Sequence, residues 1–269
     1  MDGVRVEVNR DGVMSITLDR PATRNALSGD MAKEISLAHS RADLDDDVRV
    51  VVITGSGDAF CAGADFGRGA AVFDRPTGAE FTACPVSPTA WQIRKPVIAA
   101  VNGHAIGIGL TIALHCDIRV MARNAKYGVV QVRRGVMPDA FSHWTLPRIA
   151  GLGPATDILL TGRTFDGDEA LRLGIASRVV EADQVLDTAM SIAHDVATQT
   201  SPMSVAVSKR LLWSSFESSV GHVGDEETRL HRVLMGSPDS REGVEAYLER
   251  RPPTWSSRVT RDWPDDPSA

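Results

Sequence analysis

The chain has 269 residues, of which 43% are hydrophobic and 24% are charged, and its formal net charge is −6. This length and composition are typical of a water-soluble globular protein with one large core or two small ones. The negative charge and the lack of a basic stripe argue against nucleic acid as a partner.

The first two thirds of the chain alternate strand and helix patterns. VRVEV and VMSITL, on either side of an RDG turn, alternate apolar and polar residues and predict a β-hairpin. Ser28 is the predicted N-cap of a helix that runs to about Leu44, and residues 48–57 predict a buried strand. Residues 95–122 predict strand, turn, buried helix and strand, and AKYGVV and SRVV predict further short strands. This alternation indicates an α/β core.

From about Asp183 the pattern becomes wholly helical, with short polar breaks. We therefore predict an α/β core over residues 1–200 and a helical C-terminal region over residues 201–269. Several of its helices have apolar faces, which makes this region a candidate for contact between subunits. The most apolar segment, Pro96 to Leu114, contains polar residues and glycine, so we expect it to be buried and predict no membrane span.

The cysteines and histidines argue against disulfide and metal chemistry. The chain has an odd number of cysteines, Cys61, Cys84 and Cys116, and no CxxC pair. This predicts reduced thiols and a cytoplasmic protein. The histidines form neither an HExxH motif nor a Cys/His cluster, so no metal site is expected. The acidic run from Asp43 to Asp47 is predicted to cap or follow a surface helix. The N-terminal stretch predicts no secretory signal.

Two glycine-rich segments, CAGAD at 61–65 and NGHAIGIG at 102–109, follow predicted strands. Small residues let a backbone approach a ligand, and a helix start offers free N–H donors, although tight turns against a sheet need the same residues. No GK[ST] follows them and the GxGxxG spacing is absent, which excludes a phosphate loop. The absence of a GxSxG elbow argues against a serine hydrolase.

Five motifs follow one another along nearly the whole chain: DRPATRNAL, VVVITGSGDAFCAGADF, KPVIAAVNGHAIGIGLTIALHCDIRVMARNAKYG, GRTFDGDEALRLGIASRVV and GVEAYLERRPPTW. In this order they resemble the crotonase superfamily, also called the enoyl-CoA hydratase/isomerase family. The resemblance implies a spiral of β–β–α turns and a C-terminal helical region that builds homotrimers or dimers of trimers. It also implies an acyl-CoA thioester ligand. Coenzyme A is then part of the substrate, and no separate cofactor is expected.

The resemblance further implies that two backbone N–H groups stabilise a thioester enolate. By motif, these are the amides of Ala64 and Ile108. Donors aimed at a developing oxyanion are worth about 10²–10³-fold in rate each. Ile108 stands where the family usually has glycine; its amide still donates, but isoleucine adopts a positive φ poorly and its bulk narrows the pocket.

The acid–base residues depart from the family pattern. Where hydratases of the family carry two glutamates, this chain has Thr111 and Gln131. Neither side chain is a carboxylate base, so a two-glutamate hydration mechanism is excluded at these positions.

Asp139, in GVMPDAFSHWTLPR, has two interpretations. The local sequence favours the N-cap of a short helix, with His143 on the same helical face. Under the resemblance, Asp139 falls where some family members place a working aspartate, and we predict it to be the acid–base residue, a role compatible with capping. His143 would orient Asp139 or line the pocket, whereas His115 is predicted to be a core histidine.

The residues expected to contact CoA also come from the resemblance. They are Arg24, for which a solvent-facing position is the alternative, Ala26, Ala62, the backbone around Asp65 and Phe66, and the closing residues Tyr247, Arg250 and Trp255. Thr111 and Gln131 are predicted to line the substrate pocket.

One carboxylate suffices to carry a proton between two carbons, so the sequence favours double-bond isomerisation of an acyl-CoA over two-base hydration. Hydration or dehydration with Asp139 alone stays open. The main alternative is a non-catalytic acyl-CoA binding protein of the same fold, which would not need Asp139. A scaffold without a ligand is disfavoured because both glycine-rich segments are present in register.

Overall fold

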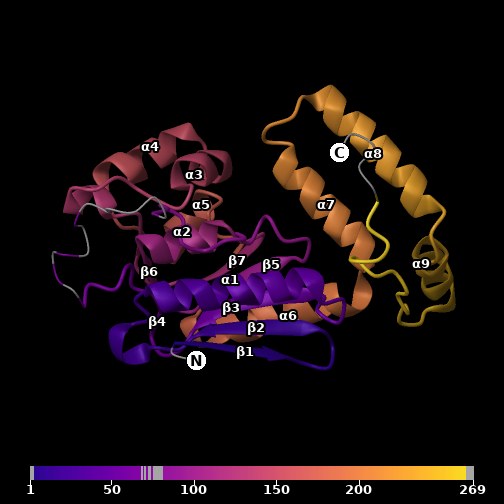
Figure 1. Cartoon of the computed structure of the whole chain (residues 1–269), viewed down its shortest axis with the longest axis horizontal. Helices are drawn as coiled ribbons and strands as arrows, with labels where there is room; N and C mark the ends of the chain where they lie inside the picture. The colour runs from indigo at the N-terminus through magenta and orange to yellow at the C-terminus, as the bar shows by residue number, and fades with distance from the viewer. Residues whose placement is uncertain (1–2, 68, 70, 72–73, 75–80, 265–269) are drawn as a thin grey trace.

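A six-stranded sheet lies at the centre of the structure, a computed structural model that describes residues 3–67, 69, 71, 74 and 81–264 (Figure 1). Its strands, in spatial order, are β1 (Val4–Val8), β2 (Val13–Leu18), β3 (Val50–Gly55), β5 (Val97–Val101), β7 (Ile118–Ala122) and β9 (Arg178–Val180). β1 and β2 pair antiparallel as the predicted hairpin, and the other neighbours pair parallel. The sequence prediction of an α/β core is confirmed.

A smaller parallel sheet is built from β4 (Ala59–Cys61), β6 (His104–Ile106) and β8 (Tyr127–Gly128). Along the chain, β4 follows β3, β6 follows β5 and β8 follows β7. The chain therefore steps from the large sheet to the small one at each turn, which is the predicted spiral. Because β4, β6 and β8 run parallel, the segments that leave them emerge at one edge.

The described helices are α1 (Gly29–Leu44), α2 (Ile108–Leu114), α3 (Ser142–Ala150), α4 (Leu152–Thr161), α5 (Gly167–Arg172), α6 (Val185–Gln199), α7 (Pro202–Ser214), α8 (Val220–Met235) and α9 (Pro238–Glu249), with short 3₁₀ turns η1 (Pro21–Thr23), η3 (Gln131–Arg134) and η4 (Ala182–Gln184). The Ser28 hydroxyl caps α1 by accepting from the Met31 amide, as predicted. Helix α3 is the short helix predicted after Asp139, whereas α4 and α5 were not predicted, because they are short and proline and glycine interrupt their apolar pattern.

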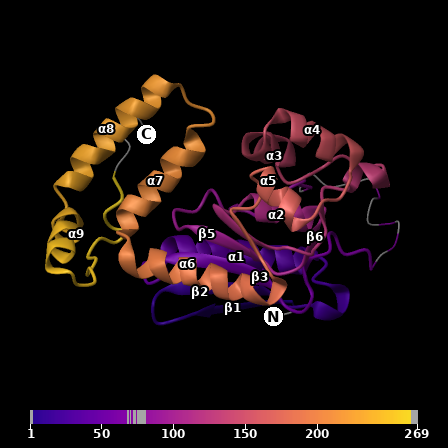
Figure 2. The ribbon, with the colours of Figure 1, turned by 180° about the vertical axis from the view of Figure 1, so that it is seen from behind.

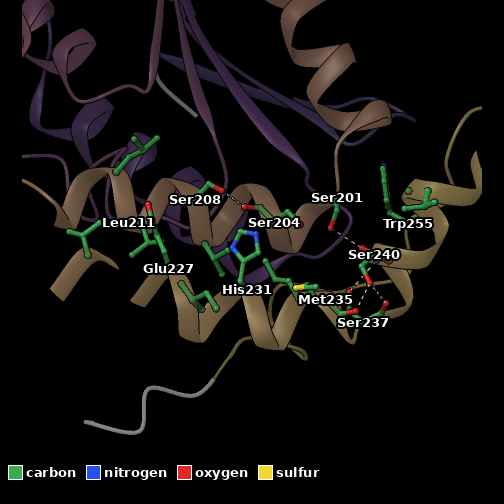
Figure 3. A pocket seen from close by; sticks show the side chains of 18 of the residues that line it. Ser201, Ser204, Ser208, Leu211, Glu227, His231, Met235, Ser237, Ser240 and Trp255 are labelled. Atoms are coloured by element: carbon green, nitrogen blue, oxygen red, sulfur yellow. Dashed lines mark hydrogen bonds between the residues drawn. The ribbon is translucent and has the colours of Figure 1, made fainter. Parts of the chain in front are cut away.

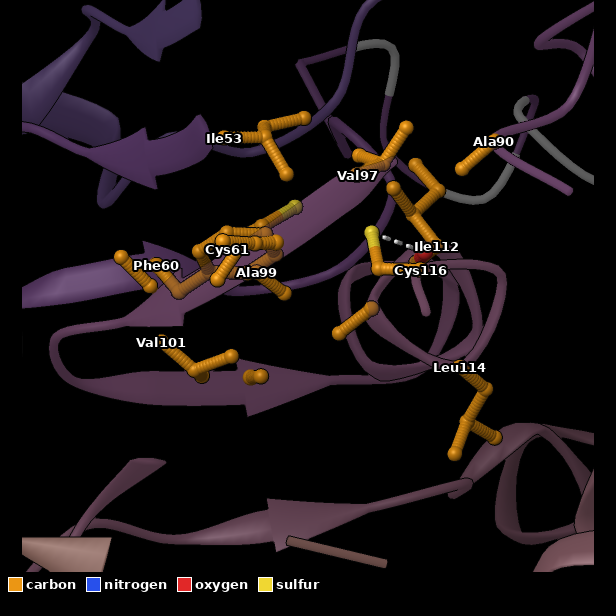
Figure 4. Packing of buried hydrophobic residues seen from close by; sticks show 14 of the residues in the cluster. Ile53, Phe60, Cys61, Ala90, Val97, Ala99, Val101, Ile112, Leu114 and Cys116 are labelled. Carbon is orange, nitrogen blue, oxygen red and sulfur yellow. Dashed lines mark hydrogen bonds between the residues drawn. The ribbon is translucent and has the colours of Figure 1, made fainter. Parts of the chain in front are cut away.

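Helices α1 and α6 cover opposite faces of the large sheet (Figures 1 and 2). Strands β3 and β5 are therefore buried along their whole length, as expected for parallel strands covered on both sides. Figure 4 shows part of this core, to which β3 and β5 contribute Ile53 and Val97 and in which Cys61 and Cys116 are also buried. Burial raises the pKa of the Cys61 thiol to about 11 and that of Cys116 to about 12, so both are unreactive thiols at neutral pH.

The acidic run at the end of α1 forms ion pairs with a neighbouring loop. Asp43 pairs with Arg94 at 2.8 Å, and Asp46 lies 3.7 Å from Lys95. The run therefore follows a surface helix, as predicted. Within the described ranges no group of three or more acidic, cysteine or histidine side chains could hold a metal ion.

Helices α7 to α9 lie apart from the two sheets (Figure 1), and α7 is joined to the core by a buried ion pair. The Lys209 ammonium lies 2.8 Å from Asp117 and donates to the carbonyls of Ala90 and Lys95. Asp117 also accepts from the indole N–H of Trp213 at 2.7 Å. In the part of the chain that the structure describes, no helix is long and apolar enough to cross a membrane. Residues 265–269 of the predicted C-terminal region lie outside the described residues.

Candidate functional site

The two glycine-rich segments meet at one cavity, beyond the ends of β4 and β6. The cavity is lined by Ala62, Gly63, Ala64, Phe66, Ile106, Gly107, Ile108, Val130, Gln131, Arg134, Val136 and Asp139. The structure thus brings together six residues that sequence reasoning placed in the site: Ala62, Ala64, Phe66, Ile108, Gln131 and Asp139. The parallel pairing of β4 with β6 brings the two glycine-rich segments together, because both strands end at the same edge of the sheet.

The amide of Ala64 is turned toward the cavity by a β-bridge. Leu27 forms a parallel bridge in which its N–H donates to Gly63 at 2.8 Å and its carbonyl accepts from Asp65 at 3.0 Å. In a parallel bridge of this kind, the residue between Gly63 and Asp65, which is Ala64, directs its N–H away from the partner strand. The Ala64 N–H donates no hydrogen bond to the described residues, and Ala64 lines the cavity.

The amide of Ile108 is free because Ile108 is the first residue of α2. The first N–H groups of a helix have no partner within the helix, and no acceptor from elsewhere in the described chain reaches this one. The left-handed backbone falls on Gly107, with φ of 56°, and not on Ile108. Isoleucine therefore needs no positive φ at this position, and its backbone is unstrained.

Asp139 does not cap α3. That helix begins at Ser142, its N-cap residue is Phe141, and no side chain caps it. The Asp139 carboxylate accepts from the amide nitrogen of Gln131 at 2.9 Å and lies 3.4 Å from the Thr111 hydroxyl. The capping prediction is wrong, and the carboxylate lines the cavity instead.

Burial raises the pKa of the Asp139 carboxyl above its usual range, although hydrogen bonds from Gln131 and Thr111 act in the opposite direction. Because a carboxylate only accepts, the nitrogen of the Gln131 amide must face Asp139. The Gln131 oxygen is then left as a buried acceptor with no partner among the described residues. A carboxyl group with a raised pKa is suited to take up and release a proton.

A buried histidine holds the backbone beside Asp139. Ala140 and Phe141 have φ values of 44° and 55°, in the left-handed region that non-glycine residues rarely adopt. The His115 Nε2 atom lies 2.7 Å from the Ala140 carbonyl. Burial lowers the pKa of His115 to about 4, so the ring is neutral at pH 7 and donates from Nε2. His115 is the predicted core histidine, but its contact with the Asp139 turn was not predicted.

Several predicted contact residues lie elsewhere. His143 is exposed on α3 and is not part of the cavity wall, and Tyr247 and Arg250 are exposed on and after α9. Trp255 lines a larger hollow between α7, α8 and α9, shown in Figure 3. Within the described chain, these four residues are not brought to the Asp139 cavity.

The remaining predicted CoA contacts lie beside the cavity. The exposed Arg24 uses its carbonyl to accept from the Ala62 amide at 3.0 Å, and Ala26 is half-buried two residues later. Asp65 forms an ion pair with Arg20 at 2.8 Å, and the Arg20 hydrogen bond holds the pKa of Asp65 below its usual range. Sequence reasoning did not identify Arg20 as the partner that fixes this segment, nor Arg134 in the cavity wall.

Comparison with known proteins identifies the family. Residues 8–258 match the family model described as enoyl-CoA hydratase/isomerase. The chain belongs to this family. A probable enoyl-CoA hydratase of Mycobacterium leprae is 38% identical over 90% of this chain and 94% of its own, and the 1,2-epoxyphenylacetyl-CoA isomerase of Escherichia coli is 33% identical over 92% and 96%.

A solved structure shows the same fold. The crystal structure of a probable enoyl-CoA hydratase/isomerase from Mycobacterium abscessus superposes with a TM-score of 0.92 at 46% identity, covering 95% of this chain and 99% of that one. The protein is thus an enzyme of the enoyl-CoA hydratase/isomerase family, whose members act on acyl-CoA thioesters.

Proposed function

We propose that this enzyme moves a proton along the acyl chain of a CoA thioester and thereby shifts a double bond. The observation that carries the proposal is the presence of two free amides and one carboxylate in a single cavity. Asp139 is the one acidic side chain among the described residues that line it. A relative named as an isomerase, the 1,2-epoxyphenylacetyl-CoA isomerase, supports isomerase chemistry on this fold.

In the proposed mechanism, the thioester oxygen accepts hydrogen bonds from the amides of Ala64 and Ile108. Asp139, as the carboxylate, removes a proton from one acyl carbon, and the electrons pass into an enolate whose oxygen the two amides stabilise. The same carboxyl group returns the proton to another carbon, so the substrate and product have the same composition. Gln131 donates to Asp139 and keeps it aimed into the cavity.

Hydration by Asp139 alone is a second candidate, favoured by one feature. The unpartnered oxygen of Gln131 is a buried acceptor in the cavity wall, where it is suited to hold a water molecule beside Asp139. In this mechanism Asp139 would take a proton from the water as the water oxygen adds to the far carbon of the double bond, and would then give that proton to the carbon next to the thioester carbonyl.

A panel of acyl- and enoyl-CoA thioesters incubated with the protein separates these functions. Isomerisation gives a product of unchanged mass that chromatography resolves, whereas hydration adds the mass of one water. Binding without either change, at high enzyme concentration, would favour a non-catalytic acyl-CoA binding protein. Failure of every thioester to bind would refute the proposal.

We also propose that α7 to α9 assemble the chain into trimers or dimers of trimers. Exposed apolar side chains on these helices support this assembly: Leu212, Val220, Val233, Met235, Val244 and Leu248. Large exposed apolar surfaces commonly mark interfaces. The CoA contacts expected of Tyr247, Arg250 and Trp255 stay predictions, to be tested in that assembly.

A further inference from the structure

Arg134, the last residue of η3, is the one cationic side chain among the described residues that line the Asp139 cavity. Family resemblance did not assign it a role. No described carboxylate lies within ion-pair distance of its guanidinium group, and no described acceptor takes a hydrogen bond from it. Arg134 is exposed, and because no described carboxylate or hydrogen-bond acceptor engages its guanidinium group, that group is available to an anionic ligand.

Unlike Arg134, the neighbouring arginines Arg133 and Arg163 donate to protein acceptors. Arg133 donates through Nε to the Thr161 carbonyl at 2.9 Å, and Arg163 forms ion pairs with two carboxylates at 2.5 and 2.8 Å. Both line an outer hollow that shares Arg134 with the Asp139 cavity. Arg134 therefore stands between the two spaces, and the other arginines are already held by protein acceptors.

The guanidinium of Arg134 is positioned by an aromatic ring. Its central carbon lies 5.6 Å from the centroid of the Phe66 ring, and Phe66 lines the same cavity. This cation–π contact takes up none of the N–H donors of the guanidinium as hydrogen bonds to a protein acceptor, so they stay available to a ligand. Arg134 forms no hydrogen bond or ion pair with Asp139, whose carboxylate accepts from Gln131 and Thr111.

We propose that the acyl group of the substrate carries a carboxylate, which Arg134 binds inside the cavity. The inference rests on the proposed function, because the amides of Ala64 and Ile108 must first fix the thioester oxygen there. A planar guanidinium binds a carboxylate through two parallel hydrogen bonds, which no neutral acyl chain can form. CoA also carries anions, but its phosphates lie at the far end of the pantetheine arm, whereas Arg134 lines the cavity that holds the amides.

The test measures binding to saturated thioesters, which contain no double bond to shift or hydrate. Calorimetry would compare succinyl-, glutaryl- and adipyl-CoA with the methyl esters of their free carboxylates, and with the same acyl groups on pantetheine, which lacks the phosphates of CoA. At the best-fitting length we expect the free carboxylate to bind about 10- to 100-fold more tightly than its ester, as for a hydrogen bond to a charged group.

Arg134→Gln should abolish this preference, on CoA and pantetheine thioesters alike, without weakening the esters. Arg133→Gln, which lies in the outer hollow, should keep it, and thermal melting of both variants checks their folding. A preference that survives in Arg134→Gln would overturn the inference. The inference would also be overturned if Arg134→Gln weakened the binding of acids and esters equally, but only when they are attached to CoA and not to pantetheine. The partner of Arg134 would then be a phosphate of CoA.

Two further outcomes separate this inference from the proposed function. Esters that bind the wild-type protein as tightly as the free acids at every length would overturn the role of Arg134 alone. Absence of binding by any thioester, acid or ester, would overturn the proposed function itself.

Discussion

The carboxylate of Asp139 and the amide of Gln131 are joined by a hydrogen bond of 2.9 Å across the wall of the cavity. The bond fixes the orientation of both groups, because a carboxylate can only accept. It directs the Gln131 nitrogen at the Asp139 carboxylate and leaves the Gln131 oxygen without a partner among the described residues. At the positions where the family resemblance places two glutamates, this enzyme has Thr111 and Gln131. Both of these side chains contact Asp139.

Replacing Asp139 with asparagine should lower turnover of the true substrate by ~10²-fold or more, since it removes the base. Steady-state kinetics on the substrate found in the thioester panel would measure this. Thr111→Ala is the control, because threonine cannot supply a base, and it should retain most of the activity. Full turnover by Asp139→Asn would contradict the proposed role of Asp139.

The same substitution should stabilise the protein at neutral pH. Burial raises the pKa of Asp139 in the folded state, so the folded protein binds this proton more tightly than the unfolded chain does. Ionised Asp139 therefore costs stability once the pH rises through the folded pKa, and asparagine removes that cost while still accepting from Gln131. The melting temperature of Asp139→Asn should exceed that of the wild type at pH 7, and the gap should shrink in acid. A lower melting temperature at pH 7 would contradict this.

His115→Leu should impair catalysis through the backbone of Ala140. Leucine has no donor, so the Ala140 carbonyl loses its 2.7 Å hydrogen bond and the turn that carries Asp139 is released. We expect a loss of about 1–3 kcal/mol in stability and a fall in kcat with an altered acid limb of the pH profile. His115→Gln places an amide donor near Nε2 and should recover part of both. Equal kcat in the leucine and glutamine variants would show that the hydrogen bond does not position Asp139.

Acid should destabilise the protein through two buried histidines. Burial lowers the pKa values of His39 and His115 to about 4 from 6.5, with Lys209 adding to the effect on His39 and His39 to that on His115. Between pH 6.5 and pH 4 the unfolded chain binds protons that the folded protein does not, so stability falls as pH drops, by roughly 3 kcal/mol per histidine. Urea unfolding at several pH values should show this fall, and His39→Gln with His115→Gln should flatten it. An unchanged pH dependence in the double variant would refute this explanation.

Lys209→Met should loosen α7 from the core. The substitution leaves Asp117 without its cation, and breaking a buried ion pair typically costs 3–5 kcal/mol, roughly the loss expected here by urea unfolding. Lys33 pairs with Asp30 on the surface, and Lys33→Met should change stability by less than about 1 kcal/mol. Similar effects of the two substitutions would argue against Lys209 as the main attachment.

The assembly proposal predicts a mass near three or six times 28.9 kDa by light scattering. Burial of the exposed apolar faces of α7 to α9 would drive the association. Leu212→Glu, on an exposed face of α7, should shift the mass toward that of the monomer, whereas Leu37→Glu, exposed on α1, should not. A wild-type mass of one chain at all concentrations would refute the proposal.

The sequence by itself determined the features that depend on local pattern. Alternating residues in β1 and β2, the Ser28 cap of α1 and the apolar run of β3 were all predicted and are confirmed, because each is decided within a few residues. The order of the glycine-rich motifs identified the family, which the comparisons confirm.

The tertiary structure alone decided where the side chains of the site point. Local pattern assigned Asp139 to a helix cap, but its carboxylate lines the cavity and accepts from Gln131, and the left-handed Ala140 and Phe141 separate it from the start of α3. His115, 25 residues away from Ala140, contacts that turn. Such contacts between distant segments leave no periodic trace in the sequence, because packing sets them and local backbone preference does not.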